Sequence, residues 1–177
     1  MEREKTAVVV IDIQGKLATL MNSSEQTILH IEQLIKGANI LNLPVLWLEQ
    51  YPKGLGPTVE SIAAEIEGQP IEKITFSAWR SDEFKRALIE SNKKKILLCG
   101  IEAHICVYQT AMDLKNAGFQ VEIVSDAIDS RTLDNKELAL TRFMQEKIPL
   151  TSVEMALFEL VEIAQGDEFK AISHLVK

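Results

Sequence analysis

Six short apolar runs recur along the chain, and stretches with helical spacing separate them. The first run, Ala7 to Ile11, is β-branched after its alanine, a composition typical of a strand buried on both faces of a parallel sheet. Comparable runs lie at 45–48, 71–75, 96–99, 121–124 and 148–151. Alternating strands and helices predict βαβ units, whose right-handed crossovers place helices on both faces of a sheet. We therefore expect an α/β fold with a doubly wound, mainly parallel six-stranded sheet.

The residues between these runs indicate where elements begin and end. Ser23 and Gln26 have capping-box spacing, so we expect a helix after Ser23. We also expect Ser81 to cap a helix, Asp134 to start another and Gly100 to end the fourth strand. Further helices are predicted at 59–66, 104–116 and 152–164, and a loop at 51–57.

The composition predicts one globular domain spanning 1–177. Hydrophobic residues make up 46% and charged residues 25%, which argues against a disordered chain or a coiled coil. The net charge of −7 offers no basic surface for nucleic acid, and no apolar run approaches the roughly 18 residues of a membrane helix. The polar N-terminus lacks the pattern of a secretory signal, and the two cysteines form no Cys-x-x-Cys motif. We therefore expect a cytoplasmic protein that binds neither nucleic acid nor a membrane.

Three residues suited to acyl transfer lie at or just beyond predicted strands. Asp12 follows the first strand, Lys73 lies in the third, and Cys106 lies in the first helical turn after the fourth. Taken singly, they read as a turn residue, a solvated charge and a small buried apolar residue. Together they offer more: a helix N-terminus and a lysine favour a thiolate, and a carboxylate can move its proton. Because ligands bind at the carboxyl ends of strands in such sheets, we expect the three side chains to meet in one pocket.

Several segments resemble those of one enzyme superfamily. Val9 to Gln14, Lys73 to Trp79 and Gly100 to Val107 are similar, in this order, to the opening, lysine and nucleophile segments of the isochorismatase-like cysteine hydrolases. Segments 49–58 and 126–131 resemble more closely the isochorismatase domain-containing branch of uncharacterised hydrolases. The resemblance extends over nearly the whole chain and implies a Rossmann-like hydrolase fold.

The resemblance also implies roles for individual residues. Cys106 matches the family's nucleophile, Asp12 its general base and acid, and Lys73 the group that supports the thiolate. It further implies a cis peptide bond between Ile101 and Glu102, which would direct the backbone amides of Glu102 and Cys106 into an oxyanion hole. The residues implied to line the substrate pocket are Gln14, Tyr51, Trp79 and His104.

Departures from the family pattern argue against two better-defined activities. Nicotinamidases of the family bind a metal through an Asp and two His in the segment after the second strand, and 49–58 contains no His. Isochorismatase proper lacks the cysteine nucleophile that Cys106 represents here. We therefore expect neither a metal nor another cofactor.

The leading hypothesis is a hydrolase of a small amide or related C–N bond that acts through a Cys106 thioester. Its expected partners are a small-molecule substrate and further copies of the same chain, as a dimer or tetramer. Two alternatives stay open. One is a catalytically weak scaffold or interaction protein that keeps the hydrolase fold, and the other is a redox sensor that uses Cys106.

Overall fold

A computed structural model describes all residues, 1–177. Six parallel strands form one sheet, as predicted, and their order in the sheet is β3-β2-β1-β4-β5-β6. The strands are β1 (Thr6–Ile11), β2 (Val45–Gln50), β3 (Ile71–Lys73), β4 (Lys95–Ile101), β5 (Gln120–Asp129) and β6 (Leu150–Thr151). The chain order reverses its direction across the sheet between β1 and β4, and this is where such folds bind ligands.

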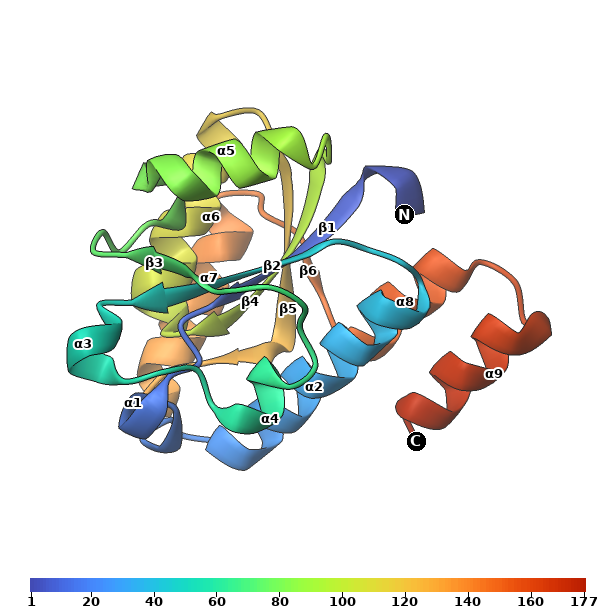
Figure 1. Cartoon of the computed structure of the whole chain (residues 1–177), viewed down its shortest axis with the longest axis horizontal. Helices are drawn as coiled ribbons and strands as arrows, with labels where there is room; N and C mark the ends of the chain where they lie inside the picture. The colour runs from blue at the N-terminus through green and yellow to red at the C-terminus, as the bar shows by residue number, and fades with distance from the viewer.

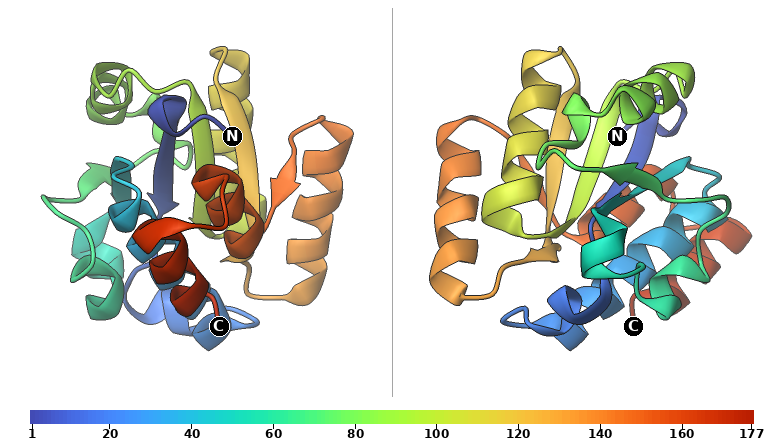
Figure 2. Two further views of the ribbon diagram at one scale, coloured as in Figure 1. Left: turned by 90° about the vertical axis from the view of Figure 1, so that its right-hand side faces the viewer. Right: turned by 60° about the vertical axis from the view of Figure 1, so that its left-hand side comes forward.

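Helices cover both faces of the sheet (Figures 1 and 2). One face packs against α2 (Ser24–Ile40), α8 (Val153–Val161), α9 (Gly166–Leu175) and the short α4 (Glu60–Ala63). The other packs against α5 (Asp82–Glu90), α6 (Tyr108–Asn116) and α7 (Leu133–Gln145). The remaining short elements are η1 (Arg3–Lys5), α1 (Gly15–Thr19), α3 (Pro52–Leu55), η2 (Ala78–Arg80) and the π-helical η3 (Ala103–Val107). None of the helices combines the length and apolarity needed to cross a bilayer.

Strand β1 lies in the middle of two hydrophobic clusters. Val8 and Val10 face the α2 side, whereas Ala7, Val9 and Ile11 face the α5–α6 side. This alternation follows from the period of two in a strand, and burial on both faces explains why the run is continuously apolar. The residue that follows β1 therefore starts from a strand with little freedom to move.

Gly100 does not end the fourth strand, contrary to the prediction. It lies inside β4 with φ of +116°, opposite Ile11 of β1. A Cβ atom at Gly100 would lie 2.1 Å from the Ile11 carbonyl oxygen. Glycine is therefore required by a close approach between two strands, and the sequence signal for a break was misleading.

Two further boundaries differ from the prediction. Strand β5 continues to Asp129 after a register shift opposite β4, whereas the sequence predicted its end near 124. Helix α7 is capped by Thr132, whose side chain accepts a hydrogen bond from the Asn135 N–H, rather than by Asp134.

The predicted caps at two other helices have different outcomes. Ser81 caps α5 by accepting from the Phe84 N–H. Ser23 precedes α2 as predicted, but its side chain does not cap the helix. Its backbone N–H instead donates to Asp129 Oδ2 at 2.6 Å, so a residue distant in sequence replaces the predicted local contact.

Candidate functional site

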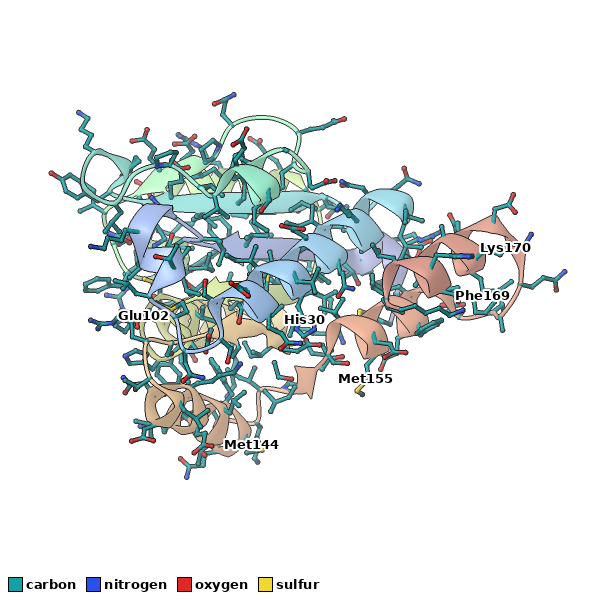
Figure 3. The ribbon with its side chains drawn as sticks, turned by 90° about the horizontal axis from the view of Figure 1, so that it is seen from below. His30, Glu102, Met144, Met155, Phe169 and Lys170 are labelled. Carbon is teal, nitrogen blue, oxygen red and sulfur yellow. The ribbon has the colours of Figure 1, made fainter.

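The carboxyl ends of β1, β3 and β4 bring three predicted site residues into one region. Asp12 directly follows β1, Lys73 is the last residue of β3, and Cys106 lies in η3 after β4. Asp12 and Cys106 therefore flank the point at which the strand order reverses. In Figure 3 the neighbouring Glu102 lies at the opposite end of the view from Phe169 and Lys170 of α9.

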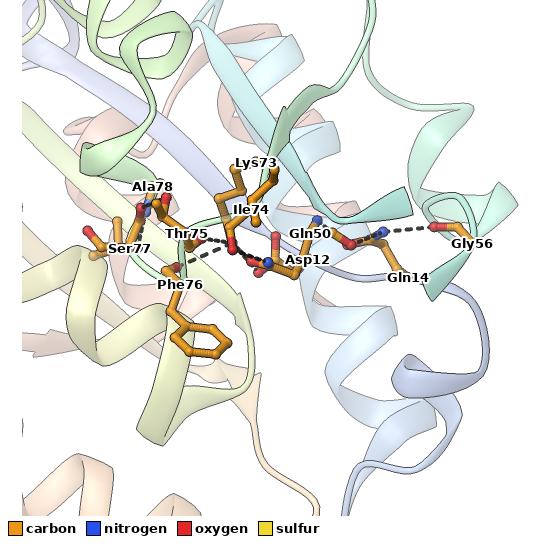
Figure 4. A network of polar contacts seen from close by, with 11 residues as sticks. Asp12, Gln14, Gln50, Gly56, Lys73, Ile74, Thr75, Phe76, Ser77 and Ala78 are labelled. Carbon is orange, nitrogen blue, oxygen red and sulfur yellow. Dashed lines mark hydrogen bonds and ion pairs between the residues drawn. The ribbon is translucent and has the colours of Figure 1, made fainter. Parts of the chain in front are cut away.

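Lys73 is the centre of a network of polar contacts (Figure 4). Its ammonium Nζ lies 2.7 Å from Asp12 Oδ2 and 2.7 Å from Gln50 Oε1. It also donates to the backbone carbonyls of Thr75, at 3.3 Å, and Phe76, at 3.2 Å. The Lys73 side chain is inaccessible to solvent. Four acceptors around three ammonium protons restrict the position of the ammonium group.

Asp12 combines a constrained backbone with a partly free carboxyl group. Its φ is +53°, which is uncommon for a residue other than glycine. Oδ2 pairs with Lys73, whereas Oδ1 is buried and has no hydrogen-bond partner. Burial raises the pKa of Asp12, although the Lys73 charge and hydrogen bond act against that rise. One carboxylate oxygen is therefore available to accept a proton.

The Cys106 thiol is nearly buried, and its surroundings oppose its ionisation. Burial, followed by the Asp12 charge, raises the pKa of Cys106 to about 12, although Lys73 lowers it in part. No full hydrogen bond joins Asp12 to Cys106, but a weaker thiol–carboxylate interaction contributes to the pKa of both groups. Burial therefore acts against the thiolate that the helix position and the lysine were expected to favour, because desolvation outweighs the nearby cation.

The turn before Cys106 has a cis peptide bond between Ile101 and Glu102, the position that the family resemblance implies. The Glu102 carbonyl accepts from the N–H groups of Ile105 and Val107, which starts the π-helical turn. The Glu102 N–H itself donates to no group of the chain. It is therefore available to bind an anionic oxygen.

The Glu102 side chain pairs with Arg131 at the end of β5. Its Oε2 accepts from Arg131 Nε at 3.0 Å and from the Arg131 backbone N–H at 3.2 Å. Arg131 pairs with neither of the nearby carboxylates, Asp126 and Asp129. The contact links the strand end of β5 to the turn that carries Cys106.

The Gln14 side chain is bound by backbone groups of the fold. It is fully buried, and its Oε1 accepts from the Gln50 N–H at 2.6 Å. Its Nε2 donates to the Gly56 carbonyl at 2.7 Å and to the Gln50 carbonyl at 3.2 Å. Through these backbone contacts Gln14 anchors the 51–57 loop, and its contact with a substrate stays a prediction.

Tyr51 lies at a hollow beside the lysine. The hollow has a volume of about 440 Å³, and its walls include Tyr51, Lys73 and Arg80. Tyr51 is exposed, with φ of +38°. Asp12 and Cys106 do not line this hollow.

Trp79 and His104 have partners within the fold. Trp79 packs edge-on against Phe119, with ring centroids 5.3 Å apart, so its ring contributes to the α5–α6 side of the core. His104 lies in η3, and its Nδ1 is 2.9 Å from Ser130 Oγ. Cys106 lies in the same π-helical turn as His104.

Sequence reasoning missed the roles of Gln50 and Thr58. Gln50, the last residue of β2, contacts Lys73, whereas the preceding Glu49 does not. Glu49 is buried and accepts from both the N–H and the hydroxyl of Thr58. The only available signal was the position of Gln50 at the end of β2. In addition, no three His, Cys, Asp or Glu side chains are grouped so as to hold a metal ion.

Comparison with known proteins finds relatives that extend over nearly the whole chain. The isochorismatase domain model matches residues 6–155. A secreted isochorismatase effector of Phytophthora sojae is 40% identical over 97% of this chain and 84% of its own length. Isochorismatase domain-containing protein 2 of Danio rerio is 34% identical over 97% of this chain and 86% of its own length.

A solved structure supports the same relationship. The structure titled MAR1 ribonuclease from Caenorhabditis elegans is 33% identical, covers 99% of this chain and 91% of its own, and has a TM-score of 0.92. The chain therefore belongs to the isochorismatase family, near its isochorismatase domain-containing branch, and has the hydrolase fold of that family.

Proposed function

We propose that the protein is a cysteine hydrolase that cleaves a small amide or related C–N bond through a Cys106 thioester. One observation carries this proposal: the Asp12 carboxylate, paired with Lys73 through one oxygen, keeps its other oxygen free beside the Cys106 thiol. A scaffold protein has no physical need for a buried ion pair next to a buried thiol, since desolvating both charges is costly.

The proposed reaction starts from a neutral thiol. Asp12 Oδ1 removes the thiol proton as the sulfur attacks the substrate carbonyl, and the carbonyl electron pair moves onto oxygen. The backbone N–H groups of Glu102 and Cys106 stabilise the resulting oxyanion. When the oxyanion collapses, the C–N bond breaks, and protonated Asp12 gives its proton to the leaving amine.

The second half of the reaction regenerates the enzyme. Asp12 removes a proton from water as the water oxygen attacks the thioester carbonyl. When the C–S bond breaks, Asp12 returns this proton to the sulfur, which releases the acid product and restores the Cys106 thiol and the Asp12 carboxylate. Lys73 maintains the position of Asp12 throughout. The proposed steps use only groups of the chain and the substrate, without a metal or another cofactor.

The proposal also covers partners and location. Ile74 and Phe76, next to Lys73, are exposed, and contact between two copies of the chain would bury them. We expect a dimer or tetramer, and a monomer in sedimentation at micromolar concentration would contradict this. A small-molecule substrate and a cytoplasmic location remain predictions.

The first test is the pH dependence of Cys106 alkylation by iodoacetamide, followed by peptide mass spectrometry. If Asp12 is the base, the rate rises with pH as Asp12 ionises, well below the pKa of about 12 of the thiol. Asp12→Asn should slow alkylation at pH 7 by about a hundredfold, the usual contribution of a general base. Cys99, fully buried, serves as the internal control.

The outcomes separate the hypotheses. Slow alkylation that increases only near the thiol pKa, unchanged in Asp12→Asn and Lys73→Met, would contradict the hydrolase proposal and favour a scaffold. Reversible oxidation by dilute peroxide in a protein without amide hydrolysis would favour the redox sensor.

A panel of small amides, assayed for released ammonia or amine, then identifies the substrate class. RNA belongs in that panel because one structural relative is named a ribonuclease. We expect no RNA cleavage, since the net charge of −7 disfavours phosphate binding.

A further inference from the structure

Gln50 makes contacts on three sides at the end of β2. Its Oε1 accepts from Lys73 Nζ at 2.7 Å, and its Nε2 donates to the Ile74 carbonyl at 2.7 Å. Its backbone N–H and carbonyl both bind the buried amide of Gln14. These contacts orient the amide, because a flipped amide would place its NH₂ against the ammonium. Figure 4 shows Gln50 between Gln14 and Lys73.

Of the two short contacts made by the Lys73 ammonium, one is with Gln50. Asp12 and Gln50 each lie 2.7 Å from Nζ, whereas the Thr75 and Phe76 carbonyls are farther away, at 3.3 and 3.2 Å. Without Gln50, the ammonium would be free to shift toward these two carbonyls. The ion pair with Asp12 would then lengthen, and its electrostatic energy depends directly on that distance.

The chemical type of Gln50 also matters. Its amide oxygen is neutral. It can therefore orient the Lys73 ammonium without forming a second ion pair that would weaken the one between Lys73 and Asp12. The other ionisable groups that influence Asp12 or Cys106 are Glu49 of β2 and Glu102 before η3. Glu49 is already occupied by Thr58, and Glu102 by Arg131.

We propose that Gln50 is a positioning residue that acts through Lys73, holding its ammonium against Asp12 so that Asp12 can accept the Cys106 proton. This inference rests on the proposed function. Gln50 touches neither the thiol nor, in the proposed reaction, the substrate.

The test compares the pH profile of Cys106 alkylation in the wild type and in Gln50→Met. Methionine keeps the length of the side chain and removes both hydrogen bonds. A less firmly held Lys73 raises the pKa of Asp12. The acid limb of the profile, in which the rate rises as Asp12 ionises, should therefore move to higher pH by about half a unit to one unit. On the rising limb, this corresponds to a rate loss of roughly three- to tenfold. Gln26→Met makes the same change at an exposed position of α2 and should leave the profile unchanged.

A second variant keeps the proposal testable if Gln50→Met does not fold. Gln50→Glu retains an acceptor for Lys73 but adds a carboxylate that competes with Asp12, so the acid limb should again move upward. An unchanged acid limb in a folded variant, as judged by its thermal unfolding, overturns the role of Gln50. If the wild type itself has no acid limb below the thiol pKa, the proposed function fails instead. The two failures are therefore distinguishable.

Discussion

Replacing Gly100 with alanine tests how closely β1 and β4 must approach to form the site. The added Cβ atom would lie 2.1 Å from the Ile11 carbonyl oxygen and 2.6 Å from the Ile11 nitrogen. Both are backbone atoms of a buried central strand, so they cannot turn away as a flexible side chain can. The two strands would have to separate by roughly an ångström, against the 4.7–4.9 Å spacing that their hydrogen bonds require.

Two costs contribute to the expected loss of stability in Gly100→Ala. A residue other than glycine at φ of +116° carries backbone strain of about 1–3 kcal/mol. Overpacking adds about 1–3 kcal/mol. We therefore expect the free energy of unfolding in urea to fall by about 2–6 kcal/mol, a large part of the roughly 5–15 kcal/mol of a typical domain. Cys106 alkylation at pH 7 should slow as well, since strand separation moves Asp12 away from the thiol.

Gly118→Ala is the matched control. Gly118 also has a positive φ, +91°, but its added Cβ atom would meet nothing within 4 Å. Gly118→Ala should therefore lower the free energy of unfolding only by the backbone strain, about 1–3 kcal/mol, and leave Cys106 alkylation unchanged. If Gly100→Ala were no more destabilising than Gly118→Ala, the close approach of β1 and β4 would be refuted as the reason for the glycine.

Three further substitutions test contacts away from Gly100. Thr58→Val should cost about 1–3 kcal/mol in urea unfolding because the buried Glu49 carboxylate loses a hydroxyl donor, whereas Thr58→Ser should cost much less. Ser152→Ala should cost about 1 kcal/mol by removing the cap of α8. Burial raises the pKa of Asp113, but hydrogen bonds and charge, mainly from Arg80, outweigh this and lower it. Arg80→Met should therefore cost less than about 1 kcal/mol at pH 7. The difference from wild type should disappear as the pH falls below about 4, through the lowered pKa of Asp113.

Local sequence patterns were sufficient to predict the architecture. The run from Ala7 to Ile11 is apolar at every position because β1 has helices on both faces, so its pattern reports its place in the sheet. Strand-to-helix alternation then implied crossovers of one hand, and the residues at strand ends implied one region for Asp12, Lys73 and Cys106. These predictions rely on the spacing of apolar residues and on the order of strands and helices along the chain, both of which can be read from short segments of sequence.

Three features depended on groups that lie far apart in the sequence. Asp12 and Lys73 are separated by 61 positions, so neither pattern could show that one carboxylate oxygen would be paired and the other left free. The pKa of Cys106 followed from burial, which a helix position and a nearby lysine do not reveal. Gly100 had the sequence signal of a strand break, yet it is the approach of Ile11 from another strand that requires it.

The sequence by itself thus determined the fold class, the order of the strands in the chain and the chemical types at the strand ends. Only the tertiary structure decided their burial, their partners and the contacts of Gln14 and Gln50. The physical reason is range: periodicity acts over a few neighbouring residues, whereas desolvation and hydrogen bonding depend on every segment that reaches the same point in space.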